Sequence, residues 1–108
     1  MNKADIKKGE VIVNRLAQIK TLKLFRVGCD ERNFEILQKL PLTAKEVEKE
    51  LGLSPMPTNK RINELMDVGL VHREKRGENI KQTEMTKYFI EHISNIKKEV
   101  ISNMAKLI

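Results

Sequence analysis

The 108-residue sequence predicts a mainly α-helical domain that carries one small β-hairpin. Three observations indicate this fold class. Apolar residues recur at helical spacings over most of the chain, a helix–turn–helix signature occupies residues 42–71, and a turn-forming triplet divides the segment that follows. One domain is expected at this length, and we divide it into an N-terminal helical extension (1–29), a core (30–83) and a C-terminal helix (84–108).

The first two segments predict two consecutive helices. Over residues 5–27, apolar side chains form one stripe that ends at Gly28: Ile12, Leu16, Ile19, Leu22 and Phe25. The alternation over residues 22–27 leaves a short strand open as an alternative for the end of this segment. Residues 30–40 predict a second helix that is N-capped by Asp30. Its expected buried face consists of Phe34, Leu37 and Leu40.

Residues 42–71 carry the strongest local signals. Thr43 and Glu46 have the spacing of a capping box, in which each side chain bonds the backbone amide of the other residue at a helix start. Gly52 ends that helix, and a second helix follows over residues 55–68. The residues expected to face inward from the two helices are Val47, Leu51, Thr58, Ile62 and Leu65. Two short helices joined by a turn with glycine form a helix-turn-helix.

The end of the chain predicts a hairpin and a long helix. Residues 70–73 and 80–83 are the expected strands, and Gly77-Glu78-Asn79 supplies the turn between them. Residues 84–108 have the apolar spacing of a coiled-coil seam, which consists of Phe89, Ile93, Ile96, Val100, Met104 and Leu107. Such a helix is too long and too apolar to bury itself on so small a domain. We therefore expect a homodimer joined by this helix, with help from residues 6–27.

The stretch from Gly52 to Val71 resembles the recognition-helix region of ArsR-like winged-helix regulators of bacteria and archaea, with its turn glycine, buried Leu53 and Gly-Leu-Val ending. Residues 42–47 are similar to the preceding helix of that family, and residues 83–87 to the junction after its wing. The resemblance implies a winged helix-turn-helix that binds double-stranded DNA and regulates transcription, with the helix 55–68 in the major groove. The paired cysteines of metal-sensing members are absent here, so metal sensing does not carry over.

Net charge and polar residues favour the same partner. The chain has a net charge of +6 and a pI of about 9.6, which favours a polyanion. Asparagine pairs with adenine and lysine reaches guanine or phosphate, while basic residues of the wing (73–81) flank a phosphate row or enter the minor groove. The candidate DNA-binding residues are Thr43, Lys45, Met56, Asn59, Lys60, Arg61, Asn63, Arg73, Lys75, Arg76 and Lys81. Arg61, at the edge of its helix, is expected to meet the DNA backbone.

Two other functions remain open. Pro55, Met56 and Pro57 stand where hydrogen-bonding residues are usual in the family, which favours a sequence-tolerant, chromatin-like DNA-binding protein. The other alternative is a winged helix that serves as a protein-interaction subunit of a larger machinery. No catalytic motif, cofactor motif or membrane-length apolar run is present. The single Cys29, expected to be at least half-buried, forms no internal disulfide. We expect a cytoplasmic, nucleoid-associated protein that is not an enzyme and binds no metal, cofactor or membrane.

Overall fold

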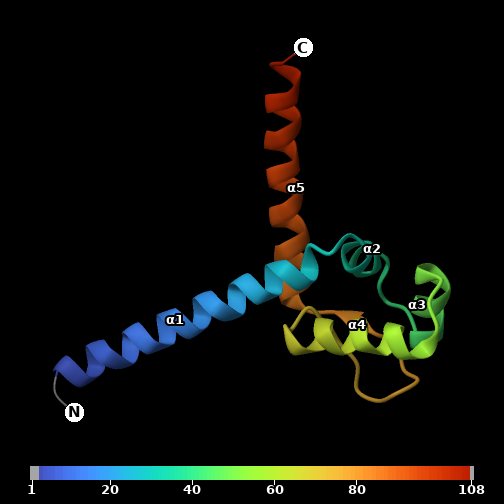
Figure 1. The fold of residues 1–108 in the computed structure, drawn as a ribbon, viewed down its shortest axis with the longest axis horizontal. Coiled ribbons are helices and arrows are strands. Elements are labelled where there is room, and N and C mark those ends of the chain that lie inside the picture. Colours follow the sequence, from blue (N-terminus) through green and yellow to red (C-terminus); the bar gives the residue numbers. More distant parts are fainter. Residues whose placement is uncertain (1–2, 108) are drawn as a thin grey trace.

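The computed structural model describes residues 3–107 (Figure 1). Within this range, the chain is mainly helical and contains one two-stranded antiparallel sheet, so the predicted fold class is confirmed. The elements are α1 (Lys3–Gly28), α2 (Glu31–Lys39), α3 (Ala44–Leu51), α4 (Pro55–Asp67), β1 (Val71–His72), β2 (Lys81–Gln82) and α5 (Glu84–Ala105). Residues 1, 2 and 108, which our domain boundaries include, lie outside the described residues.

Two long helices project from a small body. In Figure 1, α1 and α5 leave the body in different directions, while α2, α3, α4 and the hairpin stay together. The radius of gyration is 17.8 Å, whereas a compact domain of this length is expected to have about 13 Å. The described part of the chain measures 55 × 49 × 21 Å along its principal axes. Most of α1 and α5 therefore extends away from the packed body within residues 3–107.

The core lies where α2, α3, α4 and the hairpin meet. Its most deeply buried apolar side chains are Leu37, Ile62, Leu65, Leu70, Ile80 and Val47. The projecting helices each contribute from their roots only, with Val27 from α1 and Phe89 from α5. The hydroxyl group of Thr86 donates a hydrogen bond to the carbonyl of Leu70, which joins the start of α5 to the segment before β1. The body is thus a single packed unit from which α1 and α5 project.

Local capping explains where α2 begins and where α3 begins and ends. The Thr43 Oγ1 atom accepts from the Glu46 amide at 3.2 Å, and the Thr43 amide donates to Glu46 Oε1 at 3.1 Å, so the predicted capping box is confirmed. The carboxylate of Asp30 accepts from the Asn33 amide at 3.1 Å and caps α2. Gly52 ends α3 with a φ of 65°, a left-handed conformation that favours glycine. These signals are local, which is why the sequence reveals them.

Two expectations about the secondary structure need correction, and one bridge was not predicted. The strand alternative for residues 22–27 is wrong, because α1 continues as a helix to Gly28. The predicted strands are shorter than expected, with only Val71 paired to Gln82 and His72 to Lys81. A further bridge joins Leu42 to Ile80, so the segment before α3 extends the sheet. An isolated bridge has no alternating pattern, and the sequence therefore contains no signal for it.

Gly28 is expected to be intolerant of any side chain. A Cβ atom at this position would lie 2.7 Å from Cζ of Phe89 and 2.9 Å from Cδ1 of Leu70, both in the core. Alanine gains about 1 kcal/mol over glycine in a helix, but overpacking costs about 1–3 kcal/mol. We expect Gly28→Ala to lower the free energy of unfolding by roughly 1–2 kcal/mol in urea denaturation.

Gly9 provides the matched control on the same helix. A Cβ atom there meets nothing within 4 Å, so Gly9→Ala should raise the free energy of unfolding by about 0.5–1 kcal/mol. Both variants are compared at one protein concentration, since association also stabilises a protein. Equal stabilisation by the two substitutions would contradict the close packing of α1 against α5.

Candidate nucleic-acid interface

A basic depression lies between the start of α3, the outer side of α4 and the wing. It has a volume of about 480 Å³ and is lined by Thr43, Ala44, Lys45, Asn59, Arg73, Arg76 and Gly77. Five of the eleven predicted DNA-binding residues meet here, although they come from three segments that are distant in the sequence. Three of them carry a positive charge, and no acidic residue lines the depression. We call this feature the basic depression.

The start of α3 contributes backbone donors to the basic depression. The first amides of a helix have no intrahelical acceptor, and here the Thr43 side chain satisfies that of Glu46. The amides of Ala44 and Lys45 remain at the positive end of the helix dipole. Both residues line the basic depression, beside Arg73 and Arg76. Free amides and cationic side chains together form a favourable environment for a phosphate.

The start of α4 differs from that of α3. Pro55 and Pro57 lack a backbone N–H, and the side chain of Ser54 makes no capping hydrogen bond. Only Met56 offers an amide in this first turn, and its side chain is 83% exposed. The start of α4 is therefore poor in donors and presents an apolar side chain instead.

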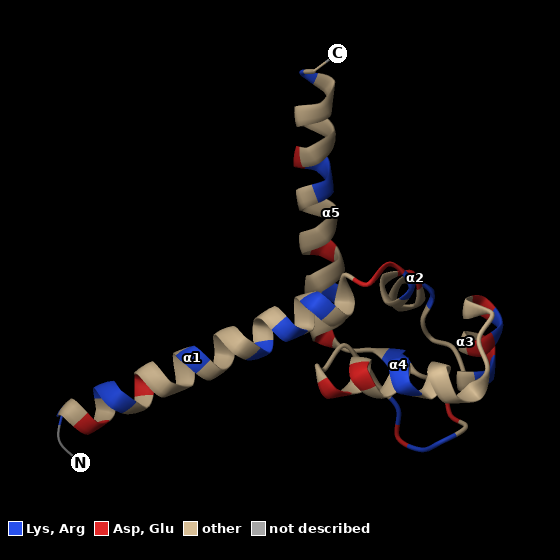
Figure 2. Ribbon diagram, viewed as in Figure 1, with Lys and Arg blue, Asp and Glu red and all other residues tan. Residues whose placement is uncertain are grey.

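The outer face of α4 brings together the other residues expected to contact bases. One shallow depression with a volume of about 580 Å³ is lined by Met56, Asn59, Lys60 and Asn63, together with Pro55, Glu64 and Asp67. Figure 2 shows the acidic residues towards the C-terminal end of α4 and basic residues along the wing beside it. Because acidic side chains repel phosphates, the first half of α4 is better suited to DNA than the second half. We did not expect this division of α4 from the sequence.

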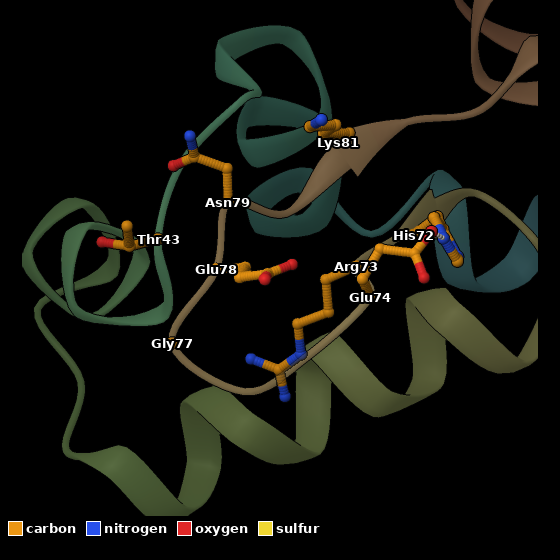
Figure 3. Close-up of a pocket in the computed structure, with 8 residues that line it drawn as sticks. All are labelled: Thr43, His72, Arg73, Glu74, Gly77, Glu78, Asn79 and Lys81. Atoms are coloured by element: carbon orange, nitrogen blue, oxygen red, sulfur yellow. Dashed lines mark hydrogen bonds and ion pairs between the residues drawn. The ribbon is translucent and has the colours of Figure 1, made fainter.

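Two basic residues of the wing segment extend in different directions (Figure 3). In this close-up, the Arg73 side chain extends towards α4, whereas Lys81 lies on the side of α2. Lys81 pairs with His72 in the sheet, whereas Arg73 follows the end of β1. Lys81 lines a second depression of about 430 Å³ that also contains Glu74 and Glu78. Thr43, Arg73 and Gly77 border both depressions, whereas Lys81 lines only the second. Lys81 is therefore not part of the basic depression.

The second depression contains one polar pair at its edge. The Nε2 atom of His72 lies 3.0 Å from Oε1 of Glu74, and both side chains are exposed. The hydrogen bond from His72 lowers the pKa of Glu74, which therefore stays ionised near neutral pH. Two carboxylates on this side make it less favourable for a phosphate than the basic depression. Lys75, for its part, is exposed on the wing between the two sides.

The guanidinium of Arg61 makes polar contacts that we did not predict. Its Nη1 atom lies 2.8 Å from Oδ1 of Asp30 and 3.0 Å from Oδ1 of Asn33, and the Arg61 side chain is only 29% exposed. The Asn33 amide and the Arg61 guanidinium lower the pKa of Asp30, so that the ion pair is present at neutral pH. These contacts hold the guanidinium against the start of α2, and the contact of Arg61 with the DNA backbone stays a prediction. Helical spacing shows that Arg61 lies at the edge of the outer face of α4, but it does not show which residues the side chain contacts.

The predicted seam of α5 is divided between the core and the surface. Phe89 is 3% exposed, and its ring centroid lies 5.4 Å from that of Phe25, so it belongs to the core of its own chain. Ile93 also packs partly against this core. The exposed remainder consists of Ile96, Val100, Met104 and Leu107, of which Leu107 lies beyond the end of α5. The expectation that Phe89 joins the two subunits is therefore corrected.

The exposed apolar face of α1 is larger than the predicted stripe. Ile12, Leu16, Ile19 and Leu22 are exposed, as predicted for a stripe without a partner in its own chain, and Phe25 is half-buried against the core. Further exposed apolar residues on the same helix are Ile6, Val11 and Val13. Cys29, just after α1, is exposed rather than half-buried as expected. Over residues 3–107, no cluster of side chains has the composition of a metal site, and no helix is long and apolar enough to span a membrane.

Comparison with known proteins identifies the fold. No protein-family model and no curated protein matches the chain. Several solved structures do, including HlyU from Vibrio cholerae (23% identity, 74% of this chain and 94% of that chain, TM-score 0.59). RV1404 from Mycobacterium tuberculosis covers 100% of this chain and 82% of its own, at 13% identity and a TM-score of 0.63. A MarR family protein from Bacillus stearothermophilus covers 96% and 81%, at 17% identity and a TM-score of 0.56.

These similarities are all below 25% identity, and they establish the fold alone. The chain has the winged-helix fold of bacterial transcriptional regulators. In this fold α3 and α4 are the helix-turn-helix and residues 73–81 are the wing. The matching structures include a MarR family protein, so the fold does not single out the ArsR-like family that the sequence resembles.

Proposed function

We propose that the chain is a double-stranded DNA-binding transcriptional regulator that acts as a homodimer in the cytoplasm. The observation that supports this best is the basic depression, where Lys45, Arg73 and Arg76 meet the open amides of α3 beside the outer face of α4. Cations and helix-start amides hold phosphates, and phosphate contacts orient a protein on the duplex. The second depression, which Arg73 also lines, contains Glu74 and Glu78 and lacks Lys45 and Arg76.

In the proposed complex, a phosphate of the duplex occupies the basic depression and α4 enters the adjacent major groove. Asn59 and Asn63 then face adenine edges, Lys60 reaches a guanine or a phosphate, and Met56 lies against a thymine methyl group. The exposed cations of the wing, Arg76 and Lys75, follow the neighbouring phosphates or the minor groove. The body, residues 30–83, performs recognition, while residues 1–29 and 84–108 serve assembly.

The two projecting helices support the proposed dimerisation. The apolar residues of α1 and of the outer half of α5 are exposed in the single chain. Contiguous exposed apolar surface of this kind marks an interface. A second copy of the same chain presents the same two faces, which suits a symmetric contact. Two α4 helices then meet successive major grooves about 34 Å apart on an inverted repeat.

A sequence-tolerant, chromatin-like DNA-binding protein is the second candidate. The donor-poor start of α4, with Pro55, Met56 and Pro57, favours it because fewer groups are available to read bases. Selection of bound sequences from a pool of random duplexes distinguishes the candidates. An enriched inverted repeat supports the regulator, and duplex retained without enrichment supports the chromatin-like protein. If no duplex is retained at low salt, both are contradicted and a protein-interaction subunit becomes the better hypothesis.

A further inference from the structure

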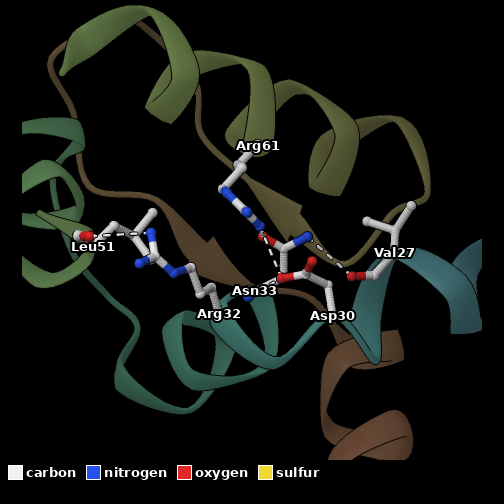
Figure 4. Close-up of polar contacts among 6 residues, drawn as sticks. All are labelled: Val27, Asp30, Arg32, Asn33, Leu51 and Arg61. Atoms are coloured by element: carbon white, nitrogen blue, oxygen red, sulfur yellow. Dashed lines mark hydrogen bonds and ion pairs between the residues drawn. The ribbon is translucent and has the colours of Figure 1, made fainter. Parts of the chain in front are cut away.

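A polar junction connects α4 to the root of α1 (Figure 4). Arg61 of α4 donates to Asp30 at 2.8 Å and to Asn33 at 3.0 Å. Asn33, which is only 3% exposed, donates in turn from Nδ2 to the carbonyl of Val27 at 3.0 Å. Val27 lies in the last turn of α1. We call Val27, Asp30, Asn33 and Arg61 the polar junction, and none of them has a part in the proposed DNA contact.

The last turn of α1 is held from a second direction by aromatic packing. Phe25 and Phe89 pack edge to face with ring centroids 5.4 Å apart. Gly28 lies so close to Phe89 and Leu70 that a Cβ atom would collide with both. The root of α1 is therefore fixed between an apolar contact to α5 and a polar contact to α4. The polar contact therefore adds a second constraint to the apolar packing of Phe25, Val27 and Gly28.

The rest of α1 has no such support. Residues 3–23 are exposed throughout, so the direction of the helix is determined at its root. From Val27 to Lys3 the helix is about 36 Å long at 1.5 Å per residue. A change of about 10° at the root therefore moves the far end by roughly 6 Å. A small change in the polar junction is amplified along α1.

We propose that Arg61 is a positioning residue that fixes the angle between α1 and α4. This inference rests on the proposed function for its consequence in DNA binding. In a homodimer assembled through α1 and α5, the angle between α1 and α4 determines the distance between the two α4 helices. Arg61 thereby sets the spacing of half-sites that the dimer accepts, without contacting DNA. Because Arg61 is itself a residue of α4, it connects α4 directly to the polar junction at the root of α1.

Pulsed electron paramagnetic resonance distances test the positioning role without DNA. In a Cys29→Ser background, spin labels at Lys8→Cys on α1 and Lys49→Cys on α3 report the direction of α1 relative to the body, because both positions are exposed. Labelled protein is diluted with unlabelled protein so that only distances within one chain are measured. The unsubstituted junction is expected to give one narrow distribution, and Arg61→Gln a distribution shifted or broadened by several ångströms.

Lys39→Gln provides the matched control. It removes ion pairs from the end of α2 to Glu35 on the same helix at 3.1 Å and to Glu50 on α3 at 2.6 Å, away from the polar junction. This variant is expected to leave the distance distribution unchanged, which separates positioning from loss of an ion pair in general. Circular dichroism at the same temperature verifies that each variant is folded. An Arg61→Gln distribution identical to that of the parent protein would overturn the proposal.

DNA binding then tests the consequence. Affinities are measured for a single half-site and for inverted repeats whose spacer is varied one base pair at a time. Arg61→Gln should bind the half-site within about twofold of the parent protein but lose most of its preference between spacers. An equal loss on the half-site and on every repeat would identify Arg61 as a DNA contact and overturn the proposal. If the parent protein binds no duplex, the proposed function fails, and the spin-label distances still decide the positioning role.

Discussion

Replacing Lys45, Arg73 and Arg76 together by alanine is expected to weaken binding to duplex DNA by about 100- to 1000-fold at about 0.1 M salt. All three line the basic depression and, in our proposal, each neutralises a phosphate. Every neutralised phosphate contributes about 0.9 to the slope of log affinity against log salt concentration. The triple variant should therefore lose about 3 in this slope, measured by fluorescence anisotropy of a labelled duplex over a salt series.

The control removes the same charge elsewhere. Lys20, Lys97 and Lys98 lie on the two projecting helices and are exposed. Their joint replacement by alanine should change the affinity only a few-fold, because long-range attraction between exposed charges is screened within about 10 Å at this salt concentration. If both triple variants lose affinity equally, net charge alone attracts the DNA and the basic depression is not its binding site.

Val100→Glu is expected to convert the proposed dimer into a monomer. In a single chain Val100 is exposed on the outer half of α5, between Ile96 and Met104 on the same face. A carboxylate buried against that face costs several kcal/mol when it has no partner. A symmetric dimer incurs this cost twice, so the dissociation constant should rise by at least about 1000-fold. Sedimentation velocity at micromolar concentration measures the change.

Ser102→Glu on the opposite side of α5 is the matched control, since two residues of a helix turn it by about 200°. It adds the same charge to the same helix and should leave the dimer intact. A parent protein that sediments as a monomer at micromolar concentration would contradict the proposed assembly, as would a Val100→Glu variant that remains a dimer.

The sequence predicts those parts of the fold that depend on neighbouring residues. The capping box of Thr43 and Glu46 involves residues three apart, and the left-handed Gly52 terminates its own helix. The inward positions Thr58, Ile62 and Leu65 of α4 follow from helical spacing and are buried. Such signals require no knowledge of the remaining chain, and they are sufficient to indicate a helix-turn-helix.

The parts that were predicted wrongly depend on tertiary packing. Periodicity identified Phe89 as one member of an apolar seam, but it does not show where the body of the domain ends and free helix begins. The ion pair of Arg61 was missed because its acceptors, Asp30 and Asn33, are about thirty residues earlier in the chain. The bridge from Leu42 to Ile80 joins residues without any pattern in common. In each case the partner is known only once the chain has folded.

The candidate interface was predicted only in part: its residues were recognised from the sequence, but their arrangement was not. Lys45 and the capped start of α3 were recognised from local sequence, and Arg73 and Arg76 from their place on a basic hairpin tip. Their convergence on one depression depends on how the hairpin packs beside α3 and α4, which local sequence does not show. Arg73 lines this depression and also the second one, whereas Lys81 lines only the second.

The central claim is that duplex DNA lies across the basic depression and the first half of α4. Titration of ¹⁵N-labelled protein with a short duplex, followed by amide chemical shifts, maps the contact directly. We expect the largest changes at Lys45, Asn59 and Arg76 and at the amides around them, with α1 and the outer half of α5 unaffected. Changes confined to α1 and α5, or no change at low salt, would contradict the account.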